Sequence, residues 1–188
     1  VYAAMSEAIA SFERTDSFAP FTSKYDRYLR GEVQLTDEEE LGRVLFFSEQ
    51  FTNCALCHMN GVSAINPRET FTNNQYFNIG VPVNADLRAR NGVAAEFIDD
   101  GLLANPAIDD PSMRGQFRTP TLRNVAVTGP YMHNGVFEDL RSVILFYNQY
   151  NSRNPKRRIN PETGAPWAPP ETGGTLSLEE LEHGPALD

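Results

Sequence analysis

The pattern of hydrophobic and polar positions predicts helices at the start of the chain. In residues 2–13, Met5, Ile9 and Phe12 recur at the spacing of one helical face. A second, shorter helix is predicted over 24–30. The N-terminal part of the chain is therefore expected to be helical.

The stretch LTDEEELGRVLFF, residues 35–47, predicts a third helix. Thr36 followed by Glu39 forms a capping box, and the acidic residues suit the positive end of a helix. Gly42 lowers helix propensity, so it predicts the close approach of another helix. The expected buried stripe consists of Leu41, Val44 and Leu45.

The rest of the chain alternates between long irregular stretches and short helices. Residues 60–120 are rich in Asn, Gly, Pro and Asp and predict mostly loop, and 121–135 predict a short helix and a turn. A stronger helix is predicted over 137–150. Its apolar face consists of Leu140, Val143, Ile144 and Tyr147. Beyond a polar, proline-rich segment, 177–182 predict a last short helix, so the fold class is mainly α with long loops.

The net charge and the lengths of the apolar runs exclude some classes of partner but do not identify the function. The 188 residues carry a net charge of −9, which argues against nucleic acid and anionic membranes as partners and would suit a basic protein. No apolar run approaches the roughly 20 residues of a membrane-spanning helix. The chain begins with Val1, and we interpret it as processed or as part of a longer protein.

The segment NCALCHMN contains both cysteines of the chain and one of its three histidines. C-x-x-C-H is the signature of covalent c-type haem attachment. Thiols at Cys54 and Cys57 can reach the two vinyl groups along one edge of a porphyrin. The next residue, His58, then lies under the iron and supplies an imidazole ligand.

Three other interpretations of this motif are weaker. A thioredoxin-like redox pair needs a βαβ setting, which is absent upstream. A zinc site would need His133 or His183 as its fourth ligand, and neither lies at a known zinc spacing. A disulfide would close a small, strained loop. We therefore expect one covalent haem c, which places the protein on an extracytoplasmic side such as the bacterial periplasm.

Several further motifs follow in a specific order. They are TPTLRN at 119–124, GPYMHNG at 129–135, FYN at 146–148 and APWAPPET at 165–172. With TDEEELGRVLFF and CALCH, they make the chain similar to the C-terminal haem domain of the bacterial di-haem cytochrome c peroxidase and MauG family. APWAPPET is similar to the MauG-like members. The resemblance extends over almost the whole chain.

This resemblance implies a domain organisation. Residues 1–33 look like the helical segment between the two haem domains, and 34–188 look like a c-type cytochrome domain. Family members carry two C-x-x-C-H motifs, whereas this chain has one. The one it lacks belongs to the N-terminal haem domain, where hydrogen peroxide binds. We expect that domain, or a second polypeptide, to be a partner.

The resemblance also bears on the second axial ligand of the iron. In MauG-like members a tyrosine holds this position, and it falls on Tyr147. Periodicity alone favours a core role for Tyr147, since it shares the apolar face of its helix. Met132 is the alternative ligand, because a thioether suits haem iron and raises its potential.

Other site residues are expected from the same motifs. Arg123 is expected to neutralise a haem propionate, and His133 to lie near the haem, bonded to a propionate. A surface salt bridge and an ordinary loop histidine are their bland alternatives. The backbone carbonyls of Thr128 and Pro130 resemble the family's calcium site between domains, so calcium is a further expected cofactor.

The expected function follows from these residues and the resemblance. It is an electron-transferring or electron-storing haem domain of a di-haem peroxidase or MauG-like oxidase that uses hydrogen peroxide. The MauG-like variant would oxidise aromatic residues of a redox partner protein. The alternatives are a stand-alone mono-haem cytochrome c that carries electrons, and a domain whose haem only stabilises the fold.

Overall fold

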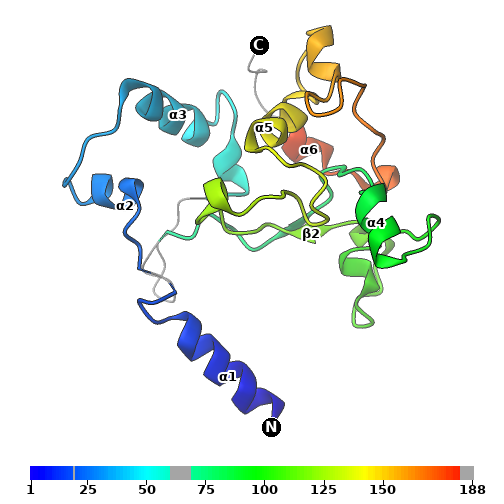
Figure 1. Ribbon diagram of the computed structural model, residues 1–188, viewed down its shortest axis with the longest axis horizontal. Coiled ribbons are helices and arrows are strands. Elements are labelled where there is room, and N and C mark those ends of the chain that lie inside the picture. The colour runs from blue at the N-terminus through cyan, green and yellow to red at the C-terminus, as the bar shows by residue number, and fades with distance from the viewer. Residues whose placement is uncertain (19, 60–68, 183–188) are drawn as a thin grey trace. The chain divides into compact units, whose positions relative to one another are not determined.

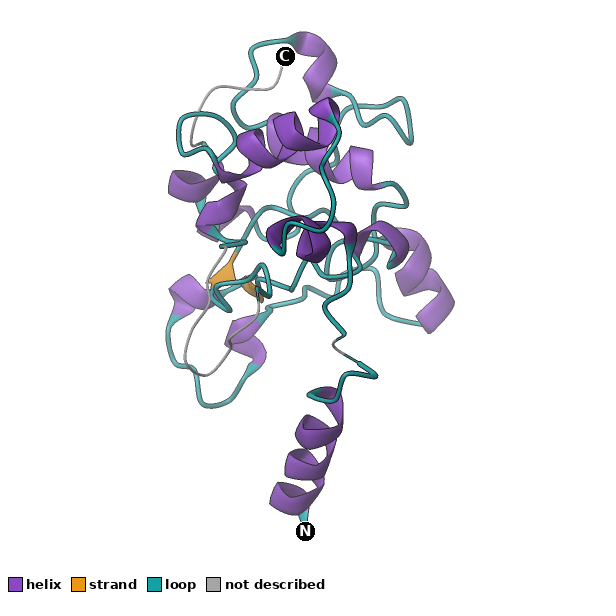
Figure 2. Cartoon of the chain, turned by 90° about the vertical axis from the view of Figure 1, so that its left-hand side faces the viewer, coloured by secondary structure: helices purple, strands orange, loops and turns teal. Residues whose placement is uncertain are grey.

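The computed structural model describes residues 1–18, 20–59 and 69–182, which form mostly helix and loop (Figures 1 and 2). The α-helices are α1 (Tyr2–Glu13), α2 (Lys24–Leu29), α3 (Asp37–Phe47), α4 (Ala85–Asn91), α5 (Leu140–Asn148) and α6 (Leu178–Leu181). The strands are β1 (Tyr76–Phe77) and β2 (Phe117–Arg118). The 3-10 turns are η1 (Cys54–Leu56), η2 (Leu102–Ala104), η3 (Pro111–Met113), η4 (Val125–Val127), η5 (Pro155–Arg158) and η6 (Gly173–Thr175). Across these residues, no helix has the length and apolar character needed to cross a membrane.

The chain divides into two compact units, Val1–Val44 and Leu45–Asp188. The predicted helices α1, α2 and α3 are present, and capping boxes mark where α2 and α3 begin. The capping box of α3 is confirmed: the backbone N–H of Thr36 donates to Glu39 Oε2 at 2.7 Å, and Thr36 Oγ1 accepts from the N–H of Glu39 at 3.3 Å. Its acidic first turn thus begins where the sequence predicts.

The predicted burial of α3 is wrong. Leu41 and Val44 are 59% and 46% exposed, and only Leu45 is partly buried. Outside its own helix, nothing in the described part of the chain lies within 4 Å of a Cβ built on Gly42, so the predicted close approach is absent there. The physical reason is that helical periodicity identifies which face is apolar, but it carries no information on what covers that face.

The core of the second unit lies where α5 meets the segment that follows it. Phe137 and Phe146 are each 1% exposed, and the Trp167 ring packs edge-on against both at 5.6 and 5.5 Å between centroids. The helix begins at Leu140 because the Asp139 carboxylate accepts from the Arg141 N–H at 2.7 Å. This cap explains why α5 starts three residues later than predicted.

The face of α5 that the sequence predicts to be apolar is not the face that the protein itself buries. Ser142 and Phe146 are buried, whereas Ile144 and Tyr147 are 52% and 38% exposed. Hydrophobic residues therefore occupy both sides of this short helix. One side packs into the protein core, and the other presents an apolar surface.

The part of 60–120 that the structure describes contains more regular structure than predicted. β1 pairs antiparallel with β2, with Tyr76 opposite Arg118 and Phe77 opposite Phe117. Helix α4 lies between them in sequence, capped by Asn84, whose side chain accepts from the Leu87 N–H at 2.9 Å. These elements are two and seven residues long, too short for a periodic signal.

A buried asparagine joins β1 to the C-terminal segment. Asn78 is 3% exposed and donates to the Thr172 carbonyl at 2.7 Å and to Thr175 Oγ1 at 2.9 Å. Its own side-chain oxygen accepts from the Gly80 N–H at 3.0 Å. Gly80 has a φ of 72°, and a Cβ there would collide with the Tyr150 hydroxyl, so this close packing requires glycine.

Candidate functional site

The C-x-x-C-H motif lies on the short turn η1, a few residues after α3. Asn53 precedes the turn with a left-handed φ of 49°, and the His58 N–H donates to the Cys54 carbonyl at 3.0 Å. This compact turn holds both thiols and the imidazole within one stretch of five residues. Cys54 and Cys57 are free cysteines, so the turn is not closed by a disulfide.

The electrostatics of the two thiols do not match a redox pair. Burial is the main reason that the pKa of Cys57 is raised to about 11, with smaller effects from Glu180 and Cys54. Although the Cys54 side chain is accessible, the protein packed behind it raises the pKa of this thiol as well. A catalytic dithiol needs a lowered pKa, so these cysteines suit covalent attachment better than thiol chemistry.

His58 is held in the tautomer that a metal ligand needs. Its Nδ1 lies 3.0 Å from the Phe71 carbonyl oxygen. Because a carbonyl can only accept, Nδ1 carries the proton and the lone pair of Nε2 is available. Burial lowers the pKa of His58 and so favours the neutral ring. The Phe71 and Pro120 carbonyls have a smaller, opposite effect.

The carbonyl that orients His58 belongs to a strained residue. Phe71 has a φ of 52°, a conformation that a bulky residue rarely adopts without support. Support comes partly from the motif itself: the Asn73 N–H donates to the Cys57 carbonyl at 2.9 Å, and its side chain donates to the Leu56 carbonyl at 3.2 Å. The loop and the C-x-x-C-H turn therefore brace each other.

The TPTLRN motif holds this same loop from the other side. Thr121 Oγ1 donates to the Thr70 carbonyl at 2.6 Å, and Arg123 Nε donates to the Glu69 carbonyl at 2.7 Å. The Arg123 guanidinium also lies 5.1 Å from the centre of the Phe71 ring. The structure thus connects Arg123 to the loop that orients His58. Its expected contact with a propionate stays a prediction.

Sequence analysis missed the segment 69–73 entirely. Its contribution is made by backbone carbonyls and by Asn73, and carbonyl positions leave no trace in residue type. The only available signals were the polar TFTNN run itself and the hydroxyl-rich TPT motif, both suited to side chain–backbone hydrogen bonds.

Tyr147 and the cysteines are coupled electrostatically although 89 residues separate Tyr147 from His58. Desolvation by the surrounding protein is the first reason that the pKa of Tyr147 is raised, although the residue is 38% exposed, and the charges of Cys57 and Cys54 are the next two. Tyr150 is committed elsewhere, because its hydroxyl donates to the Ile79 carbonyl at 3.0 Å. Of these two tyrosines, Tyr147 is the one whose pKa the cysteines affect, and its role as an iron ligand stays a prediction.

Met132 and His133 lie in the turn that connects Tyr131 to β-bridge partner Phe137. Met132 has a φ of 70° and stays the alternative ligand. The His133 ring stacks on Phe117 with 3.5 Å between centroids, and burial lowers its pKa against the effect of Asp99 and Glu171. Its expected propionate contact stays a prediction.

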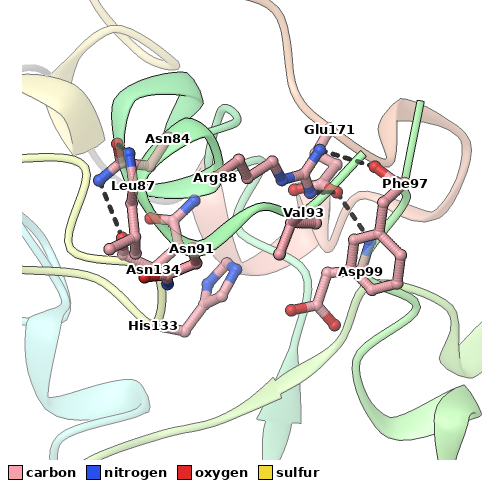
Figure 3. A pocket seen from close by; sticks show the side chains of 10 residues that line it. All are labelled: Asn84, Leu87, Arg88, Asn91, Val93, Phe97, Asp99, His133, Asn134 and Glu171. Carbon is pink, nitrogen blue, oxygen red and sulfur yellow. Dashed lines mark hydrogen bonds and ion pairs between the residues drawn. The ribbon is translucent and has the colours of Figure 1, made fainter. Parts of the chain in front are cut away.

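His133 also faces a hollow of about 210 Å³ beside α4 (Figure 3). Arg88 forms an ion pair with Glu171 at its wall and donates to the Phe97 carbonyl at 2.6 Å. On the opposite wall, the Asn84 side chain donates to the Asn134 carbonyl at 3.0 Å. The lining is polar and strongly cross-linked by its own hydrogen bonds.

The remaining sequence predictions are located as follows. Thr128 and Pro130 flank Gly129 in an exposed turn after η4, and calcium binding there stays a prediction. His183 lies outside the described residues.

Comparison with known proteins decides the family. No family model matches the chain. It is 55% identical over 185 residues, or 98% of its length, to the methylamine utilization protein MauG of Paracoccus denitrificans strain Pd 1222, of which it covers 47%. The chain belongs to the di-haem cytochrome c peroxidase and MauG family.

Other relatives agree with this assignment. This chain is also 31% identical over 160 residues to the cytochrome-c peroxidase IdrP1 of Pseudomonas sp. strain SCT. The match covers 76% of this chain and 39% of that protein. The crystal structure of the di-haem peroxidase BthA from Burkholderia thailandensis E264 matches with a TM-score of 0.68 and 31% identity, over 93% of this chain and 48% of that one. The chain thus spans about half the length of these relatives.

Family membership implies a c-type haem, and the residues present fit one. Two thiols and an imidazole occupy one turn, and the imidazole is oriented by the Phe71 carbonyl at its Nδ1. Ile144 and Leu56 add exposed apolar surface, 52% and 42% accessible. A haem is a large apolar group that such surfaces can cover.

Proposed function

We propose that this chain is the electron-transferring haem domain of a di-haem peroxidase-type oxidoreductase of the MauG-like branch. Cys54 and Cys57 would attach the haem covalently, and His58 and Tyr147 would bind the two axial positions of its iron. The haem supplies a one-electron redox centre when bound. The single observation that carries this proposal is the C-x-x-C-H turn, in which both thiols are free and the Phe71 carbonyl lies 3.0 Å from His58 Nδ1.

The protein's own residues would set the properties of that centre. His58 is kept neutral and oriented by the Phe71 carbonyl, so it can ligate without moving. Tyr147 has a phenol whose pKa the protein raises, so only a strong positive charge such as ferric iron would hold it as tyrosinate. With both axial positions filled by the protein, hydrogen peroxide would react at the other haem domain of the complete enzyme.

The activity of the complete enzyme extends this proposal beyond the chain. The 55% identity to MauG of Paracoccus denitrificans supports the MauG-like branch, and we propose that the complete enzyme oxidises aromatic residues of a partner protein. We propose an extracytoplasmic, periplasmic location, because covalent haem attachment takes place there. Calcium bound by the Thr128 and Pro130 carbonyls belongs to the same proposal.

Peroxide reactivity of the chain alone tests the assignment. We expect the haem-loaded chain to consume hydrogen peroxide no faster than buffer without protein, because Tyr147 and His58 would exclude peroxide from the iron. A Tyr147→Gly variant, which opens one axial position, is expected to gain measurable consumption. Peroxide turnover by the unmodified chain would overturn the assignment of this haem to electron transfer.

A further inference from the structure

One segment of this acidic chain carries a local cluster of positive charge. Residues 140–161 contain five Arg or Lys side chains and no Asp or Glu, although the chain as a whole has a net charge of −9. Four of the five form a basic segment within six residues. These four are Arg153, Lys156, Arg157 and Arg158. Such local clustering creates a positive surface potential inside an otherwise negative field.

Three of the four charged side chains of the basic segment are exposed to solvent. Arg153, Lys156 and Arg158 are exposed, and in the parts of the chain that the structure describes these three form no ion pair. The nearest acidic side chain after the segment, Glu162, is engaged at the start of α5, where it accepts from the Asp139 N–H at 3.0 Å. The segment therefore presents several cations whose charge no neighbouring carboxylate neutralises.

The backbone under these cations is fixed. Asn154 caps η5 by accepting from the Lys156 N–H at 3.1 Å. Trp167 Nε1 donates to the Arg157 carbonyl at 2.8 Å, and the Trp167 N–H donates to the Arg158 carbonyl at 3.1 Å. A cationic surface on a fixed backbone loses less conformational entropy on binding than one on a free loop.

The basic segment is also connected to the helix of the candidate site. η5 follows α5 and packs against it (Figure 1). Trp167, bonded to η5, packs edge-on against Phe146, and Phe146 in turn lies edge-on to Tyr147 with 6.1 Å between ring centroids. A protein bound at this surface would therefore be separated from Tyr147 by two aromatic rings, those of Trp167 and Phe146.

We propose that the basic segment docks an acidic electron-exchanging protein. Its use in electron transfer rests on the proposed function, whereas the binding itself rests on charge and geometry alone. A compact acidic patch on a protein matches three exposed cations within six residues. An extended anionic surface, such as a membrane or a nucleic acid, would also meet the net negative charge of the rest of the chain and be repelled.

Binding of plastocyanin, an acidic copper protein, provides a test that needs no turnover. The haem-loaded chain is titrated with plastocyanin by calorimetry at low and high ionic strength. The test variant combines Arg153→Gln, Lys156→Gln and Arg158→Gln. The matched control combines Arg14→Gln, Arg90→Gln and Arg118→Gln, which removes the same charge from exposed positions elsewhere. Haem spectra and circular dichroism of both variants establish that they remain folded.

We expect the unmodified chain to bind plastocyanin at low ionic strength and to lose most of this affinity at high salt. The basic-segment variant should bind about tenfold or more weakly, and the control less than about twofold. Equal weakening by both variants, no binding at low salt, or binding of phosphatidylserine vesicles in place of plastocyanin would overturn the proposal. The haem spectrum of the same samples reports on the proposed function separately. If the spectrum is unchanged while binding fails, only the docking proposal is overturned.

Discussion

Replacing Tyr147 with phenylalanine is expected to change the optical and EPR spectra of the ferric haem and to raise its reduction potential. An anionic phenolate stabilises ferric over ferrous iron, so its removal favours the reduced state. Axial ligands tune haem potentials over roughly 0.8 V, and we expect a rise on the order of 100 mV. Potentiometric titration and low-temperature EPR of the haem-loaded chain measure both effects.

Tyr150→Phe is the matched control for this prediction. Tyr147 lies in the last turn of α5 and Tyr150 just after the end of the helix, but the Tyr150 hydroxyl donates to the Ile79 carbonyl at 3.0 Å. Its loss should cost about 1 kcal/mol of stability and leave the haem spectrum unchanged. If Tyr147→Phe leaves the spectrum and potential unaltered, Tyr147 is not the ligand and Met132 becomes the candidate to test next.

Arg123 gives the second large effect, because it holds the loop that orients His58. Both Arg123→Gln and Arg123→Lys are expected to destabilise the fold by about 1–3 kcal/mol and to broaden the haem spectrum. The hydrogen bond from Arg123 Nε to the Glu69 carbonyl and the planar contact over Phe71 both need a guanidinium. Chemical denaturation and EPR line widths are the measurements.

The lysine variant separates two roles of Arg123. If its only task were to neutralise a propionate, a lysine would preserve the charge and most of the effect would disappear. If it supports residues 69–71, lysine fails almost as badly as glutamine. A lysine variant with native stability and native EPR line widths would therefore refute the supporting role and leave the electrostatic one.

Local features of this fold could be read from the sequence because they depend on neighbouring residues. The capping box of Thr36 and Glu39 forms as predicted, since both partners lie within one helical turn. The same holds for α1, whose bounds of Tyr2–Glu13 match the predicted helix. What covers each apolar face was not readable, so the predicted burial of Leu41 and Val44 failed.

The candidate site was only partly predictable for a related reason. C-x-x-C-H is a local motif, and it identified Cys54, Cys57 and His58 directly. A role for Tyr147 at this site is a long-range prediction, because periodicity assigned Tyr147 to the core and only the family resemblance indicated a ligand. The orientation of His58 depends on the carbonyl of Phe71, and no residue pattern encodes where a carbonyl points.

The account's central claim is that Cys54 and Cys57 attach one haem in this chain. Intact mass of the chain, produced with a c-type haem attachment system and combined with haem staining and thiol alkylation, tests this most directly. We predict the polypeptide mass plus one haem, with both thiols protected from alkylation. A mass equal to the polypeptide alone, with two alkylated cysteines and no haem stain, would contradict the claim.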